Sequence, residues 1–118
     1  MPSSQPELPL QIVEEDGRTI VQFPADTTLS EANAEEFGHA LTVLTTGRDR
    51  PQLLVDLGTV SMVTSVILAK FLALNGRVRA AGGRLTLVNP SPIVRQVFKV
   101  TRLDTILDVQ SKAHPIPA

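Results

Sequence analysis

The chain has 118 residues, and its 11 Lys and Arg residues nearly balance 12 Asp and Glu residues, giving a formal net charge of −1. A chain of this length accommodates one domain with a modest core, and 42% hydrophobic residues favour a folded domain over disorder. The near-neutral charge provides no overall field that would attract nucleic acid or an anionic membrane surface. Because cysteine is absent, disulfides, thiolate catalysis and cysteine-based metal sites are excluded.

The two ends of the chain lack the continuous pattern of a packed element. Residues 1–9 contain three prolines, and residues 111–118 contain two. We therefore predict a flexible N-terminal tail over 1–9, one domain over 10–110 and a flexible C-terminal tail over 111–118. The N-terminus lacks a basic segment followed by an apolar one, and no run reaches the roughly 18 apolar residues of a membrane span. We expect a cytoplasmic protein with no direct membrane insertion.

The first half of the domain predicts a hairpin followed by a helix. Residues 10–23 place apolar positions on either side of Asp16-Gly17, a dipeptide that suits the positive φ of a tight hairpin turn. Ser30 is a suitable N-cap for a helix that runs to about Thr46, and Gly47 ends it. Four apolar residues share one face of this helix at helical spacing: Ala34, Phe37, Leu41 and Leu44.

The second half predicts strands alternating with helices. Residues 52–57 form a short apolar run typical of a strand that is covered on both faces. A helix is expected to begin near Thr64 and to end at Gly82-Gly83, and residues 84–88 form the next strand.

The last part of the domain predicts two more helices. Ser91 is the expected N-cap of a third helix with Pro92 at its first position, and a short helix is expected over 103–107. The resulting order β-β-α-β-α-β-α predicts an α/β fold. Its central mixed sheet combines an N-terminal antiparallel hairpin with parallel core strands, and helices cover the sheet.

A hydroxyl-rich turn connects the strand at 52–57 with the helix that follows. The helix start offers unpaired backbone N–H groups and a partial positive charge, and the sequence delivers Thr64 and Ser65 to this point. Such a corner can bind an anion or accept a phosphoryl group. In the simplest interpretation, Thr64 or Ser65 only caps the helix by accepting a hydrogen bond from a backbone N–H group.

Three segments together resemble a STAS domain of the anti-sigma factor antagonist (SpoIIAA-like) family. They are Leu54-Val-Asp-Leu57, the run from Ala80 through Gly-Gly-Arg-Leu to Asn-Pro-Ser-Pro92, and Val97-Phe-Lys-Val-Thr-Arg-Leu-Asp104. The resemblance covers about residues 10–110. It implies a small binding module whose sheet is covered by helices. Many members of this family are switched by an ATP-dependent serine kinase that is also the anti-sigma factor, and the unphosphorylated antagonist binds that kinase and frees the sigma factor.

The chain departs from the family pattern at the turn. Family members typically have Asp-Ser-Ser-Gly-Leu-Gly, with phosphate on the second serine, whereas the aligned segment here is Thr64-Ser-Val-Ile-Leu-Ala69. Val66 occupies the acceptor position and has no hydroxyl group. Three interpretations remain: a capped helix start in a constitutive binder, phosphorylation of Ser65 or Thr64 in a degenerate motif, and a small-ligand pocket formed by the N–H groups.

The resemblance also implies a partner and a contact surface. The partner would be an anti-sigma factor and serine kinase of the histidine-kinase-like ATPase type, and the outcome would be regulation of transcription. The alternative is a STAS adaptor or subunit of a transport system or of a multi-protein signalling complex. The contact residues expected from the turn and the following helix are Thr59, Ser61, Thr64, Ser65, Val66 and Lys70.

No set of residues indicates catalysis. His39 and His114 are the two histidines, and neither has an obvious Ser or Asp partner beside it in the sequence. The acidic pairs Glu14-Glu15 and Glu35-Glu36 are interpreted as solvated surface because adjacent side chains diverge. Asp56 is interpreted as a structural hydrogen-bonding group at a strand end. We therefore expect a non-enzymatic protein without catalytic residues, metal site or cofactor.

Overall fold

A tight hairpin opens the fold in the computed structural model, which describes residues 10–110. Strands β1 (Gln11–Glu15) and β2 (Arg18–Gln22) pair antiparallel, with Val13 opposite Ile20. Asp16 and Gly17 connect them with φ values of 52° and 78°, the two positive angles of a type I′ turn. The predicted hairpin is confirmed. The predicted tails over 1–9 and 111–118, and His114, lie outside the described residues.

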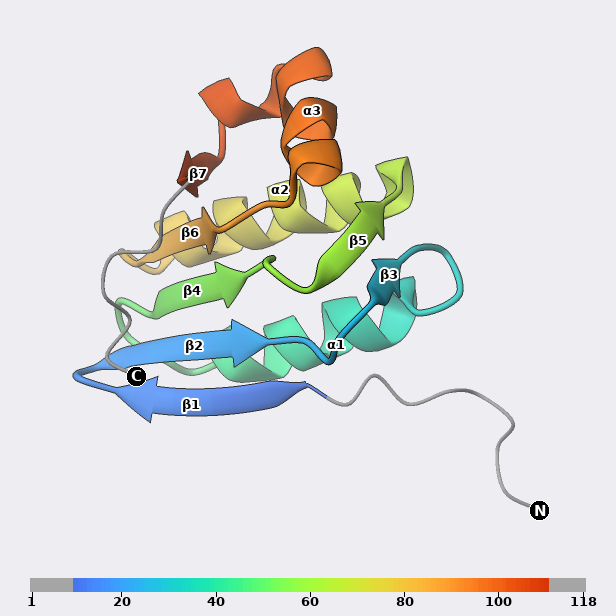
Figure 1. Ribbon diagram of the computed structural model, residues 1–118. Coiled ribbons are helices and arrows are strands. Elements are labelled where there is room, and N and C mark those ends of the chain that lie inside the picture. The colour runs from blue at the N-terminus through green and yellow to red at the C-terminus, as the bar shows by residue number, and fades with distance from the viewer. Residues whose placement is uncertain (1–9, 111–118) are drawn as a thin grey trace.

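The hairpin joins a five-stranded mixed sheet in the order β1-β2-β4-β6-β7 (Figure 1). Strands β4 (Gln52–Asp56), β6 (Arg84–Val88) and β7 (Asp108–Gln110) run parallel to β2. Only the β1–β2 pair is antiparallel in this sheet. The mixed sheet with parallel core strands is therefore as predicted, and β7 is an additional edge strand that the sequence analysis did not include.

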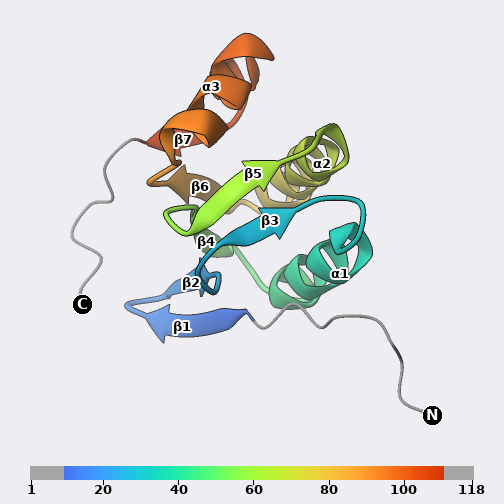
Figure 2. The same cartoon turned by 45° about the vertical axis from the view of Figure 1, so that its right-hand side comes forward.

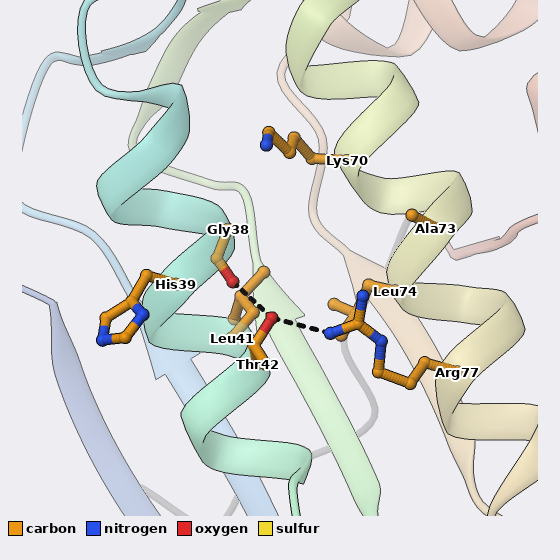
Figure 3. Close-up of a pocket in the computed structure, with 8 residues that line it drawn as sticks. All are labelled: Gly38, His39, Leu41, Thr42, Lys70, Ala73, Leu74 and Arg77. Atoms are coloured by element: carbon orange, nitrogen blue, oxygen red, sulfur yellow. Dashed lines mark hydrogen bonds between the residues drawn. The ribbon is translucent and has the colours of Figure 1, made fainter.

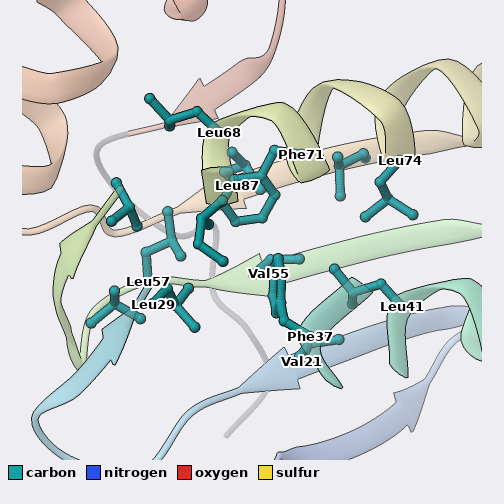
Figure 4. Close-up of a cluster of buried hydrophobic side chains, with 14 of the residues drawn as sticks. Val21, Leu29, Phe37, Leu41, Val55, Leu57, Leu68, Phe71, Leu74 and Leu87 are labelled. Atoms are coloured by element: carbon teal, nitrogen blue, oxygen red, sulfur yellow. The ribbon is translucent and has the colours of Figure 1, made fainter. Parts of the chain in front are cut away.

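Two long helices, α1 (Ala34–Thr45) and α2 (Ser65–Ala80), lie on one face of this sheet (Figure 1). They pack beside each other and are bridged by a hydrogen bond from Arg77 to Thr42 (Figure 3). Phe37 of α1 and Phe71 of α2 meet edge to face, with ring centroids 5.2 Å apart. Alternate sheet residues complete this core: Val21, Leu53, Val55, Leu85 and Leu87. Figure 4 shows Val21, Val55 and Leu87 among them.

A second, two-stranded sheet lies beyond the end of the first. Strand β3 (Thr27–Leu29) pairs parallel with β5 (Val60–Val63), and the two lie side by side in Figure 2. Helix α3 (Pro92–Val100) packs on β5. It is followed by a 3₁₀ turn, η1 (Leu103–Thr105), where the sequence predicted a short helix over 103–107.

The predicted element order is wrong in one respect, because it omits β3, β5 and β7. Each of these strands has only three or four residues, and the outward-facing positions of β5 interrupt its apolar pattern. Their pairing depends on partners far away in the chain. Short strands of this kind leave little periodicity in the local sequence.

The start of α1 also differs from prediction. Asn33, not Ser30, occupies the N-cap position, although its side chain makes no capping hydrogen bond within the helix. The Asn33 side chain instead accepts from the Ser30 N–H group at 3.0 Å and donates to the Thr28 carbonyl at 2.8 Å. The Ser30 hydroxyl accepts from Ala32 N–H at 3.3 Å, so Ser30 closes a turn that precedes the helix.

The ends of α2 and α3 follow the sequence signals closely. Gly82 has a φ of 80° after the last residue of α2, and Gly83 N–H donates to the Val78 carbonyl at 2.9 Å, which completes a Schellman motif. Ser91 is the N-cap of α3 and accepts from Val94 N–H at 3.4 Å. Pro92 occupies the first helical position, as predicted.

Candidate functional site

The turn that leads to the candidate site begins at the end of β4. Asp56 Oδ1 accepts a hydrogen bond from Gly58 N–H at 2.9 Å, which bends the chain out of the main sheet. Thr59 Oγ1 then donates to the Phe23 carbonyl at 2.9 Å and anchors the loop to the end of β2. The interpretation of Asp56 as a structural hydrogen-bonding group is consistent with these contacts.

Residues 60–63 form strand β5, where the sequence analysis predicted a continuous turn up to Thr64. Backbone bonds hold both ends of this strand to β3, from Thr27 N–H to the Thr59 carbonyl and from Thr64 N–H to the Leu29 carbonyl, each at 3.1 Å. The Ser61 hydroxyl also donates to the Thr27 carbonyl at 3.2 Å. The approach to α2 is therefore part of a hydrogen-bonded sheet.

The N-terminus of α2 places Thr64 and Ser65 together as expected. Thr64 is the N-cap residue with extended backbone angles, and its carbonyl accepts from Leu68 N–H at 3.0 Å. Its side chain makes no capping hydrogen bond. Within residues 10–110, Thr64 Oγ1 is the one buried side-chain oxygen or nitrogen without a hydrogen-bond partner. Of the interpretation that Thr64 or Ser65 caps the helix, the part that concerns the Thr64 hydroxyl is therefore wrong.

The three residues that follow differ in exposure. Ser65 is exposed, Val66 packs half-buried against the core, and Ile67 is fully buried. The first turn of α2 contains no acidic residue, so no carboxylate in that turn compensates its free N–H groups. The non-glycine residues with positive φ in the described chain all lie outside 64–69, so the segment aligned with the family turn does not require glycine. The absence of the family glycines thus introduces no backbone strain.

A groove between α1 and α2 continues from the site along the helix. It has a volume of about 270 Å³, and its lining includes Gly38, Thr42, Lys70 and Arg77. Figure 3 shows Lys70 extending from α2 toward α1, while the His39 ring projects away from the groove. Arg77 Nη1 donates to Thr42 Oγ1 at 2.8 Å. Lys70 is half-buried, and its ammonium group remains at the groove.

The six predicted contact residues are brought to one region but not to one exposed patch. Ser61 and Ser65 are exposed, whereas Thr64, Val66 and Lys70 are half-buried. Thr59 is exposed as a residue, yet its hydroxyl group is used in the bond to Phe23. Met62, which the sequence analysis did not select, is 40% exposed on β5 between Ser61 and the helix start.

The other polar candidates within residues 10–110 are exposed or half-buried surface groups. Glu14 binds Arg48 at 3.0 Å, and this hydrogen bond lowers the pKa of the Glu14 carboxyl below its ordinary value. His39 is exposed. Across residues 10–110, no three His, Cys, Asp or Glu side chains are grouped so that they could hold a metal ion. No helix in the same range is long and apolar enough to cross a membrane.

The mixed sheet, the two helices on one of its faces and the strand that leads into α2 define a small α/β domain of the STAS type. The chain belongs to the STAS domain family, because the family model described as "Mlab, STAS domain" matches residues 24–108. No curated protein matches the chain.

Solved structures of anti-sigma factor antagonists share the fold. A STAS domain protein from Planctomyces limnophilus is 23% identical with a TM-score of 0.80, covering 88% of this chain and 91% of its own. An anti-sigma factor antagonist from Mycobacterium paratuberculosis is 19% identical with a TM-score of 0.76. The match covers 93% of this chain and 90% of that protein. The phosphorylated form of the Bacillus cell fate determinant SpoIIAA is 20% identical with a TM-score of 0.63. The match covers 85% of this chain and 89% of that protein.

The groove between the helices is the part of the site that sequence reasoning missed. Thr42 and Arg77 are 35 residues apart, and their hydrogen bond depends on how α1 and α2 pack. One local signal was available: Gly38 lies in the middle of α1, where glycine costs about 1 kcal/mol relative to alanine. Such a glycine often marks a close approach by another group, which here is the Lys70 side chain.

Proposed function

We propose that the chain is a non-enzymatic regulatory interaction domain that binds an anti-sigma factor and serine kinase of the histidine-kinase-like ATPase type. Through this binding it would regulate transcription in the cytoplasm. Membership of the STAS family and the likeness to solved anti-sigma factor antagonists support the proposal. The observation that carries it is the start of α2, where exposed Ser65 follows a strand that presents Ser61 and Met62 outward.

The proposed contact surface contains the residues Thr59, Ser61, Thr64, Ser65, Val66 and Lys70. We assign direct contacts to Ser65 and Lys70, because their polar groups are exposed or lie at the groove. Ser61 is exposed, but its hydroxyl group is used in the bond to the Thr27 carbonyl, so it would help to set the shape of the surface. Thr59, Thr64 and Val66 would set the shape of the surface, since their side chains are bonded or packed inward. Met62 adds an exposed apolar contact, of the adaptable kind that methionine provides at binding surfaces.

Binding by this surface would not require the usual serine phosphorylation. Val66 at the aligned acceptor position cannot carry phosphate. Of the two remaining hydroxyl groups, that of Ser65 belongs to an exposed residue, whereas the Thr64 oxygen is buried. A kinase would therefore act on Ser65 first. Phosphate there would add about −1.5 to −2 charges at a helix start that has no acidic residue, and would change the surface that a partner meets.

Binding to purified kinases tests this function. The full chain is titrated by calorimetry into each ATPase-type serine kinase encoded in the same genome, with and without ATP, and phosphate is located by mass spectrometry. We expect one kinase to bind, and Ser65→Glu to weaken that binding at least fivefold. Gln96→Glu, an equal charge change at an exposed position of α3, is the matched control.

Absence of binding to every kinase would contradict the proposed function. Binding to a transport ATPase in a parallel titration would support the transport-adaptor alternative. Phosphate found on Ser65 would establish a displaced version of the family switch, whereas binding without phosphate under all conditions would establish a constitutive binder.

A further inference from the structure

We propose that the groove between α1 and α2 binds an acidic helical segment of the partner protein, with Lys70 and Arg77 as paired cationic contacts. This inference rests on the proposed partner-binding function and specifies the chemistry of the partner.

The charge of α2 is the first argument. The helix contains Lys70, Arg77 and Arg79 and no acidic residue, although the whole chain has a net charge of −1. Arg77 and Arg79 lie in the last turn, where the helix dipole favours cations without any ligand. Lys70 lies in the middle of the helix, where this explanation does not apply. The helix dipole therefore accounts for Arg77 and Arg79 but not for the position of Lys70.

The described chain supplies no carboxylate that pairs with Lys70 or Arg77. Within residues 10–110 the ion pairs join Arg48 to Glu14 and Arg84 to Asp108, so no carboxylate lies within 4.0 Å of the Lys70 amine or the Arg77 guanidinium. Both cations line the same groove. A groove with two uncompensated cations complements an anionic partner and repels a basic one.

The geometry holds the two cations in defined places. The Lys70 stem lies so close to Gly38 that a Cβ atom added there would be 3.2 Å from Lys70 Cδ. Thr42 Oγ1 donates to the Gly38 carbonyl and accepts from Arg77 Nη1, each at 2.8 Å, which fixes one edge of the guanidinium group. A guanidinium has five N–H donors, so several of them remain for a ligand (Figure 3).

The spacing of the cations indicates the form of the partner. Lys70 and Arg77 are seven residues apart on α2, which corresponds to about 10 Å along a helix. Two carboxylates seven residues apart on a partner helix have the same separation. Between the cations the groove is lined by apolar Leu41, Ala73 and Leu74, which suit an apolar side chain between the two acids. A helix laid into a groove is an established mode of recognition.

A defined peptide provides the direct test. The probe is a capped, alanine-rich helical peptide with Glu at positions i and i+7 and Leu at i+3 and i+4, and its control has Gln in place of both Glu residues. Amide and side-chain NMR signals of the labelled full chain are followed at low salt. We expect shifts of Gly38, Lys70 and Arg77 with the Glu peptide, and shifts at least threefold smaller with the Gln peptide.

Equal shifts with both peptides, or no shift of these residues, would overturn the inference. The same holds if inorganic phosphate at equal concentration shifts these signals and the Glu peptide does not, because the groove would then be a small-anion site. This experiment needs no natural partner, so its result is independent of whether the kinase titration succeeds.

Substitutions test the groove against any kinase that binds the wild-type chain. Lys70→Met and Arg77→Met each keep most of the apolar stem of the side chain and remove its charge. We expect each of them to weaken kinase binding about threefold. The double variant Lys70→Glu/Arg77→Glu reverses both charges and should weaken binding more than tenfold. Arg79→Met is the matched control, because Arg79 loses the same charge but lines a different cavity. If the kinase binds all variants equally, kinase binding itself stands, whereas the groove assignment and the direct contact assigned to Lys70 both fail.

Discussion

Gly83 lies directly against Pro51, so that a Cβ atom added to Gly83 would overlap the Pro51 carbonyl oxygen. The same oxygen accepts a hydrogen bond from Arg84 N–H at 2.9 Å, which aligns the start of β6 with the start of β4. Only glycine allows this close approach of two backbone segments. The residue thus serves both as the end of the helix motif after α2 and as the contact that brings two central strands into register.

We expect Gly83→Ala to destabilise the fold by about 2 kcal/mol, because the new methyl group must displace backbone atoms of Pro51. Gly76→Ala is the matched control: Gly76 lies within α2, and an added Cβ would meet nothing within 4 Å. It should stabilise the fold by about 0.5–1 kcal/mol. Urea unfolding measures both. Equal effects of the two substitutions would show that the contact with Pro51 does not limit the fold.

Replacing Thr64 with valine removes the buried hydroxyl that has no partner. Because an unpartnered buried polar group costs about 1–3 kcal/mol, Thr64→Val should leave stability unchanged or raise it by about 1 kcal/mol. Thr27→Val should lower stability by about 1 kcal/mol, because the Thr27 hydroxyl donates to the Pro24 carbonyl at 2.6 Å. Denaturant unfolding distinguishes them. A loss of about 1 kcal/mol on Thr64→Val would mean that this hydroxyl does cap α2.

The two serines at helix starts should behave differently. Ser91 accepts from Val94 N–H and donates to the Val60 carbonyl at 3.3 Å, so it caps α3 and joins it to β5. Ser91→Ala should therefore cost about 1 kcal/mol. Ser65 occupies the first helical position of α2 and is exposed, so Ser65→Ala should change stability by less than about 0.5 kcal/mol. Thermal unfolding of both variants checks the difference.

The ion pair between Glu14 and Arg48 predicts a pH dependence. Arg48 lowers the pKa of the Glu14 carboxyl in the folded state from the ordinary 4.5, so the pair contributes stability above that value. The contribution is lost as the pH falls through the lowered folded pKa. Glu14→Gln should lower the melting temperature at pH 7, and this effect should disappear once the pH lies below the lowered folded pKa.

Glu31→Gln serves as the control for that measurement, because Glu31 is exposed and makes the same change in charge. Both side chains of the pair are largely solvent-exposed, so the effect of Glu14→Gln should be small and should decrease with added salt. A difference that does not shrink as the pH is lowered through the acid range would exclude the ion pair as its cause.

Local sequence signals predicted the elements whose ends are determined by local chemistry. Asp16-Gly17 specified the hairpin, Ser91-Pro92 the start of α3, and Gly82-Gly83 the end of α2. In each case the residue type itself determines the backbone conformation or satisfies a terminal backbone group. The apolar run at 52–57 likewise indicated a parallel strand, β4, but the expectation that both of its faces are covered is wrong, because α1 and α2 lie on one face of the sheet and burial alternates along the strand.

The parts that were missed depend on contacts between distant segments. Strands β3 and β5 are held by backbone bonds between residues more than 30 positions apart, such as Thr27 and Thr59. The start of α2 was located correctly, but the orientation of the Thr64 hydroxyl depends on how the residue is packed. The groove requires α1 and α2 to lie side by side, which no local pattern specifies.

The attachment of β5 to β3 has a consequence for association. Because both ends of the strand are tied by backbone hydrogen bonds, the residues that precede α2 are already ordered before any partner arrives. Docking there would lose little conformational entropy, and less of the contact energy would be spent on arranging the surface. The association rate should then depend mainly on electrostatic attraction and therefore on ionic strength, with little contribution from a folding step.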